Sequence, residues 1–170
     1  MTSFEHSPLT RKLSAFVALS DVELAVLERL HQRRRSFVAG RDMVHQGQSS
    51  QAAYILSAGW VSSYKLQADG TRQIVDFQVP GDFLGLRSVL LRTSDHSFEP
   101  IVDIEAAEVL ANDLLDAFAQ TPRLATAILM NQTGFTGEPK ARKVSYGKGK
   151  PWEPFFDRGA RTCGAHGLGE

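Results

Sequence analysis

The chain has 170 residues, 42% of them hydrophobic, which is enough for one domain with a packed core. Its formal net charge is zero, and its single cysteine excludes a disulfide framework and any multi-cysteine metal site. No apolar run approaches the roughly 18 residues of a membrane span, and residues 1–6 lack the basic-then-apolar pattern of a signal peptide. We therefore expect a soluble, cytoplasmic protein that has no contact with a membrane.

The first predicted element is a helix that follows a flexible N-terminus, residues 1–11. Ser20-Asp21-Val22-Glu23 is a capping box, in which the serine accepts from the third helical N–H and the glutamate reaches back. The helix is expected to run into the basic segment His31–Arg35, whose charge complements the carboxyl end of the helix dipole. We interpret the three arginines as a solvated helix end rather than a phosphate-contact patch. The expected apolar face consists of Leu24, Leu27 and Leu30.

Several short strands are expected next, with glycine-containing turns between them. Asp69-Gly70 lies between two of these strands and is a strong hairpin signal. Within the first strand of that hairpin, Trp60 and Tyr64 are expected in the core. Many short strands with glycine turns favour a sandwich or jelly-roll barrel, so the predicted fold is mainly β with flanking helices. The expected strands are Ser36–Val38, Met43-Val44, Tyr54–Leu56, Trp60–Leu66, Arg72–Gln78, Ile101–Glu105 and Ala107–Leu110.

The stretch Pro80–Gly85 has the pattern of an anion-binding loop. Its two glycines allow close approach of the backbone to a phosphate, and a short apolar helix is expected directly after it. The first N–H groups of that helix would point at an anion. A polar cluster, Ser94-Asp95-His96-Ser97, follows about ten residues later. These residues predict a cradle for a small anionic ligand.

Two helices are expected after the last strand. Asn112 is expected to cap the first, and Thr121-Pro122 to begin the second, with proline at the first helical position. The second helix should fail at Gly134. The apolar residues expected on the inner sides are Leu114, Leu115, Phe118, Leu124, Ile128 and Leu129.

The composition changes abruptly near residue 130. Residues 131–170 hold eight of the fourteen glycines and three of the seven prolines, with seven Lys/Arg against four Asp/Glu. Glycine and proline at this density disfavour helix and central strand alike. We expect an irregular or disordered, glycine-rich basic tail, in which aromatic residues such as Trp152 dock locally at most.

The order of these elements resembles the sensor domain of the Crp/Fnr transcription regulators over about residues 12–130. The resemblance implies a cyclic nucleotide-binding-like jelly roll, an eight-stranded double-stranded β-helix that holds a small ligand, commonly a cyclic nucleotide. In that family a long helix then pairs two subunits and leads to a helix-turn-helix that enters the major groove. The motifs that carry the resemblance are Leu19-Ser20-Asp21, Phe37–Gly40, Gln46-Gly47, Tyr54–Trp60, Asp69–Ile74 and Pro80–Gly85.

Two replacements argue against tight cyclic nucleotide binding. Members that bind cyclic nucleotides have a ribose-binding Glu after the second glycine, where this chain has Leu86. Their phosphate-binding Arg-Ser pair is replaced here by His96-Ser97. Each lost charge-assisted contact typically costs about 1.5–3 kcal/mol, and only the neighbouring Arg87 could substitute. The candidate ligand-binding residues are Gly81, Asp82, Phe83, Gly85, Leu86, Arg87, Ser88, His96 and Ser97.

The expected function is that of a ligand-sensing regulatory domain with an unknown small-molecule effector. No helix-turn-helix pattern follows residue 130, so we expect a truncated regulator without specific DNA binding of its own. A shifted reading frame explains the abrupt change better than a natural short paralogue does. Intact relatives are expected to be homodimers, and the truncated dimerisation helix puts the dimer in doubt for this chain.

Two alternatives come from other classes, a stand-alone module that binds a small anion or a protein, and a metal-dependent cupin-like enzyme. The enzyme requires clustered histidines, whereas the five histidines are scattered along the chain, so we expect no metal and no catalytic activity. Iron–sulfur sensing is excluded by the absence of N-terminal cysteines. Haem sensing would need a ligand such as His31, His45 or His96, and nothing in the sequence distinguishes any of them, so no cofactor is expected.

Overall fold

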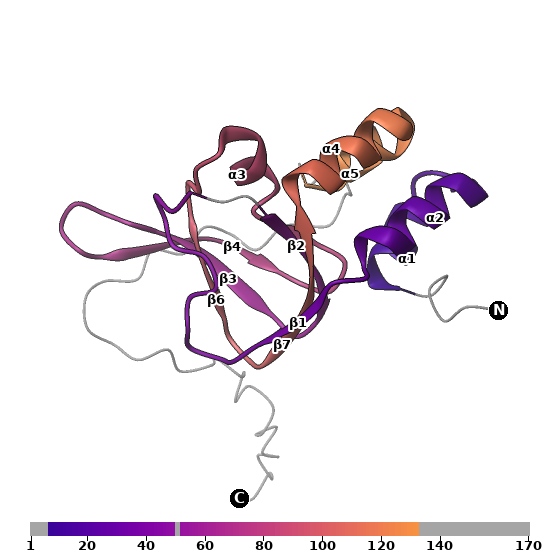
Figure 1. The fold of residues 1–170 in the computed structure, drawn as a ribbon. Coiled ribbons are helices and arrows are strands. Elements are labelled where there is room, and N and C mark those ends of the chain that lie inside the picture. The colour runs from indigo at the N-terminus through magenta and orange to yellow at the C-terminus, as the bar shows by residue number, and fades with distance from the viewer. Residues whose placement is uncertain (1–6, 50–51, 133–170) are drawn as a thin grey trace, which may run out of the picture.

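The computed structural model describes residues 7–49 and 52–132 (Figure 1). The predicted irregular tail, residues 131–170, lies outside these residues except for Asn131 and Gln132, which form the last turn of α5 and so are helical, contrary to the prediction. The predicted helix end at Gly134 also lies outside the described residues. Residues 8–11, which the sequence predicts to be flexible, begin a helix that Ser7 caps. The elements are α1 (Pro8–Ser14), α2 (Asp21–Leu30), β1 (Arg34–Phe37), β2 (Ala52–Ala58), β3 (Val61–Leu66), β4 (Arg72–Gln78), β5 (Phe83–Leu84), α3 (Leu86–Leu91), β6 (Ser97–Pro100), β7 (Ile104–Leu110), α4 (Ala111–Gln120) and α5 (Pro122–Gln132).

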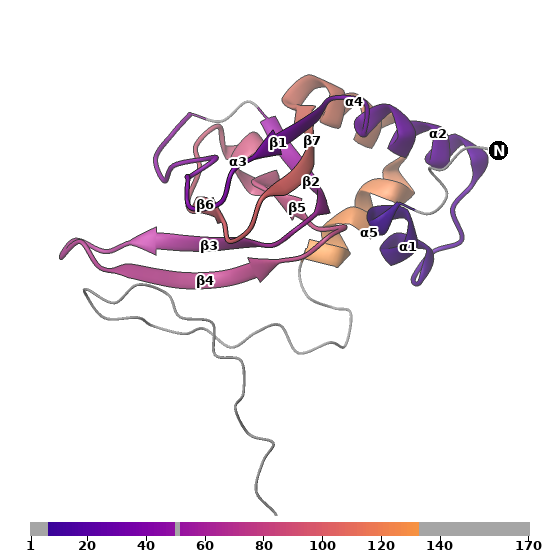
Figure 2. The same cartoon turned by 90° about the horizontal axis from the view of Figure 1, so that it is seen from below.

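The strands form two antiparallel sheets, which confirms the prediction of a mainly β fold with flanking helices. One sheet has the strand order β1-β7-β2-β5 and the other the order β4-β3-β6. Figure 2 shows the β3–β4 hairpin lying along one side of the first sheet, and Figure 1 shows α1, α2, α4 and α5 gathered at one end of the strands. The arrangement is that of a jelly roll with a helical layer at its end.

The hydrophobic core has two parts. One part packs the four-stranded sheet against the helices and includes Leu27, Ile55, Val109 and Ile128, all with 1% exposure or less. The other lies between the two sheets and is made by residues of both, among them Leu56, Val61, Leu84 and Phe98.

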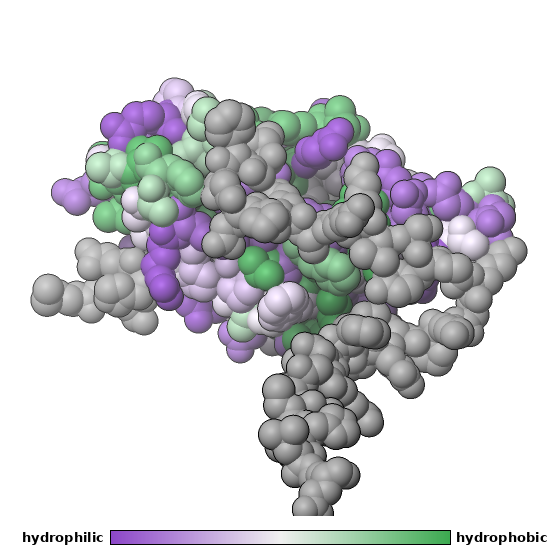
Figure 3. Space-filling model, turned by 180° about the vertical axis from the view of Figure 1, so that it is seen from behind, coloured by the Kyte–Doolittle hydropathy of each residue, from purple (hydrophilic) through white to green (hydrophobic). Residues whose placement is uncertain are grey.

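On the face seen in Figure 3 the described residues show hydrophobic and hydrophilic groups side by side. Among the described residues no helix is long and apolar enough to cross a membrane.

Helix α2 begins as predicted and ends earlier than predicted. Both hydrogen bonds of the Ser20–Glu23 capping box are present. The buried face includes Val26, whereas Leu24 is only half-buried. Arg34 and Arg35 belong to β1 and not to a helix end, because their backbones pair with β7 opposite Ala107 and Ala106. Pairing with a strand seventy residues away overrides the local helical signal.

The strand predictions are wrong in one region. Segment 101–103 forms no strand, although the backbone N–H of Ile101 donates to the carbonyl of Trp60, beside the β3–β6 pair. β6 precedes that segment, and β7 is one continuous strand from Ile104 to Leu110. Met43-Val44 contributes a single bridge to Phe98. Trp60 precedes β3 and is 54% exposed, so it is not a core residue.

The closing helices differ from the prediction at the cap of α4 and at two positions that were predicted to be buried. α4 continues from β7 with Leu110 at its N-cap position, so Asn112 lies within the helix and does not cap it. α5 begins at Pro122, as predicted. Leu115 and Leu129 face outward, with 49% and 44% exposure, because the inner face of each helix is occupied by other apolar residues.

Candidate ligand-binding site

The Pro80-Gly81-Asp82 turn packs against the edge of the first sheet. The N–H of Gly81 donates to the carbonyl of Leu56 at 2.7 Å, and the N–H of Leu56 donates to the carbonyl of Asp82 at 2.9 Å. The N–H of Asp82 closes the turn on the carbonyl of Val79 at 3.0 Å. These backbone groups are therefore already bonded within the fold.

The side chain of Asp82 joins this turn to helix α1. Its Oδ2 accepts from the N–H of Val79 at 3.0 Å, and its Oδ1 lies 2.8 Å from Nζ of Lys12. A Cβ at Gly81, where φ is +91°, would lie 2.7 Å from the carbonyl oxygen of Pro8. The next candidate residue, Phe83, is a core residue with 2% exposure. Three of the candidate residues thus serve to dock α1 and fill the core.

Gly85 begins the second half of the site, helix α3. It occupies the left-handed region with φ +69°, a conformation that glycine adopts without a steric penalty, and its carbonyl accepts from Val89 at 3.2 Å. α3 has six residues. Leu86, at 3% exposure, packs into the core with the helices. It therefore offers no polar group to a ligand.

Ser88 of α3 is linked to the segment before β6 by a chain of hydrogen bonds through Ser94 to His96. The hydroxyl of Ser88 donates to that of Ser94 at 3.2 Å, and the hydroxyl of Ser94 donates to the carbonyl of His96 at 2.7 Å. Ser88 and Ser94 are each 1% exposed. The structure thus brings Ser88 and His96 together, while Asp82 is bonded to α1.

The imidazole of His96 is paired with the carboxylate of its neighbour. Nδ1 of His96 lies 2.7 Å from Oδ1 of Asp95. Arg87, whose side chain is 77% exposed, lies 3.9 Å from the other oxygen of that carboxylate. The position expected to supply a cation to a phosphate is therefore accompanied by an anion. Sequence reasoning missed this role of Asp95, although its place directly before the histidine was a usable signal.

Ser97 is engaged by the loop that follows β1. Its hydroxyl oxygen accepts from the N–H of Gln46 at 2.9 Å, and the residue is 1% exposed. Beside it, the hydroxyl of Tyr64 donates to Oδ2 of Asp42 at 2.6 Å. Burial and the bond to Asp42 raise the pKa of Tyr64 to about 12. Neither Asp42 nor Tyr64 was predicted to lie next to the site, because both contacts join distant segments.

The described residues contain no group of three or more His, Cys, Asp or Glu side chains arranged to hold a metal ion. Nδ1 of His31 is 2.8 Å from the carbonyl oxygen of Leu27, and Nδ1 of His45 is 3.0 Å from Oδ2 of Asp42. Burial lowers the pKa of His31, which favours the neutral form of its imidazole.

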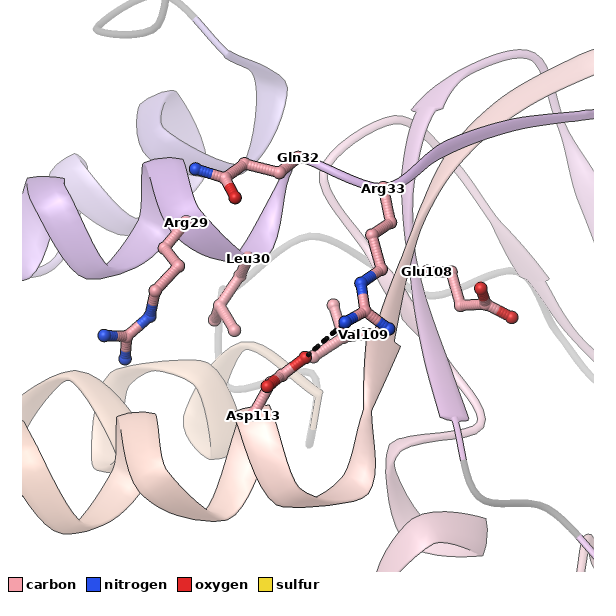
Figure 4. A pocket seen from close by; sticks show the side chains of 7 residues that line it. All are labelled: Arg29, Leu30, Gln32, Arg33, Glu108, Val109 and Asp113. Atoms are coloured by element: carbon pink, nitrogen blue, oxygen red, sulfur yellow. Dashed lines mark ion pairs between the residues drawn. The ribbon is translucent and has the colours of Figure 1, made fainter.

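A separate pocket of about 220 Å³ lies between α2, β7 and α4 (Figure 4). Leu30 and Val109 give it apolar walls. The guanidinium of Arg33 points toward Asp113, at 3.8 Å. The remaining lining residues are Arg29, Gln32 and Glu108.

Residues 34–130, more than half of the chain, match the family model described as "Cyclic nucleotide-binding domain". A probable transcriptional activator of Rhizobium leguminosarum bv. viciae is 35% identical over 65% of this chain and 45% of its own length. An anaerobic regulatory protein of Haemophilus influenzae is 26% identical over 65% of this chain and 43% of its own. The crystal structure of Thermus thermophilus catabolite activator protein superposes with a TM-score of 0.61 at 22% identity, covering 74% of this chain and 58% of that one. The chain thus spans less than half of the two curated relatives.

Proposed function

The chain belongs to the cyclic nucleotide-binding domain family of Crp/Fnr-type regulators, and from this premise we propose that it is a ligand-sensing regulatory domain that no longer binds cyclic nucleotides tightly. The relatives named as a probable transcriptional activator and as an anaerobic regulatory protein support a role in gene regulation. We infer that an effector other than a cyclic nucleotide biases two arrangements of the domain. The intact relatives are proposed to be dimers, and we propose neither catalysis nor specific DNA binding for this chain.

The observation that carries this proposal is the Asp95–His96 pair. A bidentate arginine offers two charge-assisted hydrogen bonds to a phosphate, whereas one imidazole nitrogen of His96 is already bonded to a carboxylate. The Asp95 carboxylate also repels a phosphate that approaches His96. Arg87 does not repair the site, since its exposed guanidinium lies near Asp95 itself.

The neighbouring polar groups support the same interpretation. The hydroxyl of Ser97 is bonded to Gln46, and that of Ser88 to Ser94. A cyclic phosphate that accepts from Ser88 would have to replace the bond that this hydroxyl donates to Ser94, and neither serine would offer it a fixed positive charge. The ribose would meet Leu86, which is packed into the core and accepts no hydrogen bond.

Isothermal titration calorimetry of the full chain with cyclic AMP and cyclic GMP tests the proposal. We expect no dissociation constant below about 10 μM, which corresponds to roughly −7 kcal/mol. The variant Leu86→Glu/Asp95→Ser/His96→Arg should bind more tightly than the unaltered chain by tenfold or more, and Arg87→Ala is the matched control that should change nothing. Binding by the unaltered chain with a dissociation constant below about 10 μM, or a folded triple variant that binds no more tightly than the unaltered chain, would contradict the proposal.

A further inference from the structure

Strand β4 forms one edge of the three-stranded sheet. Among the described residues it pairs only with β3, at the end of the order β4-β3-β6, and Figure 2 shows it on the outer side of the hairpin. At the opposite edge, β6 is covered in part by an antiparallel bridge between Val44 and Phe98. β4 has seven residues, three of them apolar. An uncovered strand of this kind is a template for a strand of another chain.

The hairpin turn fixes which backbone groups of β4 face away from β3. The N–H of Gln67 donates to the carbonyl of Thr71 at 2.9 Å, so the backbone of Thr71 faces the β3 side. In an antiparallel strand the N–H and C=O of one residue point to the same side, and the side alternates from residue to residue. The backbone groups of Arg72 and Ile74 therefore face outward.

A bulge at Val75 shifts this alternation by one residue. The pairing with β3 passes from Ile74 directly to Asp76, so Val75 is an extra residue on β4. The next residues whose backbone groups face outward are therefore Phe77 and Val79. The outer side of β4 thus presents two residues before the bulge and two after it.

Two aspartates occupy the outward N–H groups after the bulge. Oδ1 of Asp76 accepts from the N–H of Phe77 at 2.9 Å, and Oδ2 of Asp82 accepts from the N–H of Val79 at 3.0 Å. Each carboxylate thereby supplies the hydrogen bond that an added strand would otherwise supply. Asp82 also holds α1 through Lys12, so Asp76 is the residue whose replacement tests the edge of β4.

The outward residues of β4 are complementary to those of a second copy of this chain. A single antiparallel, two-fold register pairs all four of them: Arg72 lies opposite Val79 of the second copy, and Ile74 lies opposite Phe77 of the second copy. The two bulges then meet at the axis, so the extra residue of one strand is matched by that of the other. In every such pair, however, one N–H is already bonded to an aspartate of its own chain.

We propose that Asp76, by occupying the N–H of Phe77, keeps β4 from pairing with β4 of a second copy of this chain. A second copy is the strand to be excluded, because a strand with an uninterrupted two-residue repeat cannot match the outward residues on both sides of the bulge. Near the axis of such a pair the carboxylates of both Asp76 residues would also repel each other. The inference goes beyond the proposed function, and its failure leaves that function untouched.

Sedimentation velocity of the full chain over a series of protein concentrations tests the proposal. Asp76→Val removes the acceptor and the charge and favours a strand, so we expect it to self-associate at concentrations at least tenfold lower than the unaltered chain does. Asp76→Asn is the matched control, since its Oδ1 still accepts from Phe77 and only the charge is lost. It should associate like the unaltered chain. No increase in Asp76→Val, or an equal increase in both variants, overturns the proposal.

Amide hydrogen exchange shows whether the association uses β4. In associated Asp76→Val the N–H groups of Ile74 and Phe77 should exchange at least tenfold more slowly than in the diluted protein, because each then donates across the new strand pair. Association that leaves both rates unchanged uses another surface and overturns the proposal. If Asp76→Val does not unfold cooperatively, Asp76→Ala removes the acceptor with a smaller change in shape and is subject to the same two measurements and the same criteria.

Discussion

Nζ of Lys12 lies 2.8 Å from Oδ1 of Asp82, seventy residues further along the chain. This contact joins the first helix to the turn whose Gly-Asp pattern suggested an anion-binding loop. The carboxylate of Asp82, a predicted ligand-binding residue, instead accepts from Lys12 of α1 and from the N–H of Val79. The turn is therefore a family motif whose side chain stabilises the docking of α1 in this protein.

Asp82→Ala should destabilise the protein by about 1–2 kcal/mol, because it removes two hydrogen bonds of a half-buried carboxylate. Lys12→Ala removes only the ion pair and should cost less than about 1 kcal/mol. Urea denaturation followed by circular dichroism measures both. Equal losses in the two variants would mean that the bond to Val79 contributes nothing.

Gly81→Ala should cost about 2–3 kcal/mol, since the new Cβ meets the carbonyl of Pro8 and the backbone has φ +91°. Gly70→Ala is the matched control, because φ is +80° and no atom lies within 4 Å of the added Cβ. That variant should lose only about 1 kcal/mol. The difference between the two, measured by thermal unfolding, isolates the contact with α1. No difference would show that α1 moves aside freely.

The parts of the fold that depend on neighbouring residues were predictable. The Ser20–Glu23 capping box, the Asp69-Gly70 hairpin and Pro122 at a helix start are all local signals, and the structure has each of them. The sequence predicts a helix end at Arg34 and Arg35, whereas both residues belong to β1, because their partner strand β7 lies about seventy residues further along the chain. Pairing between distant segments leaves no trace in a local pattern.

The candidate site likewise has features that the sequence predicts and features that depend on contacts between distant residues. The replacements at Leu86 and His96 are visible in the sequence, and so is the loop that contains them. The engagement of Ser97 by Gln46 is not visible, since 51 residues separate the two. The pairing of Asp95 with His96 joins adjacent residues, and here the sequence did carry a signal, the position of Asp95 directly before the histidine.

The stability of the protein should fall below about pH 6.5 in part through His31. Burial lowers the pKa of its imidazole in the folded state from the ordinary 6.5, so the unfolded chain binds the proton more readily. The free energy of unfolding therefore decreases as the pH falls from 6.5 through the lowered value. His31→Asn keeps a donor toward Leu27 and removes the titration, so its unfolding free energy should depend less on pH between 5 and 7, about the range in which an ordinary histidine titrates. Parallel pH profiles of the two proteins would contradict this role.

Gln78→Leu should leave the stability unchanged or raise it by about 1 kcal/mol. Gln78 is buried, its Nε2 donates to Ser63 at 3.1 Å, and none of the described residues bonds to its Oε1. Because the hydroxyl of Ser63 donates to the carbonyl of Asp76, the amide orientation is set and the unbonded atom is an acceptor. Ser63→Ala should have the opposite sign, a loss of about 1–3 kcal/mol, since both ends of the amide then lack partners. Chemical denaturation compares them, and a destabilised Gln78→Leu would show that Oε1 has a bound partner in solution.

The order of the chain determines when the helical layer can assemble during synthesis. α1 and α2 leave the ribosome first, yet β1 has to wait for β7, and Glu23 has to wait for Arg123, one hundred residues later. Until then the apolar faces of both helices are uncovered, and long-range closure of this kind is slow. A nascent chain of this protein therefore needs nearly the whole described domain outside the exit tunnel before its first two helices find their place.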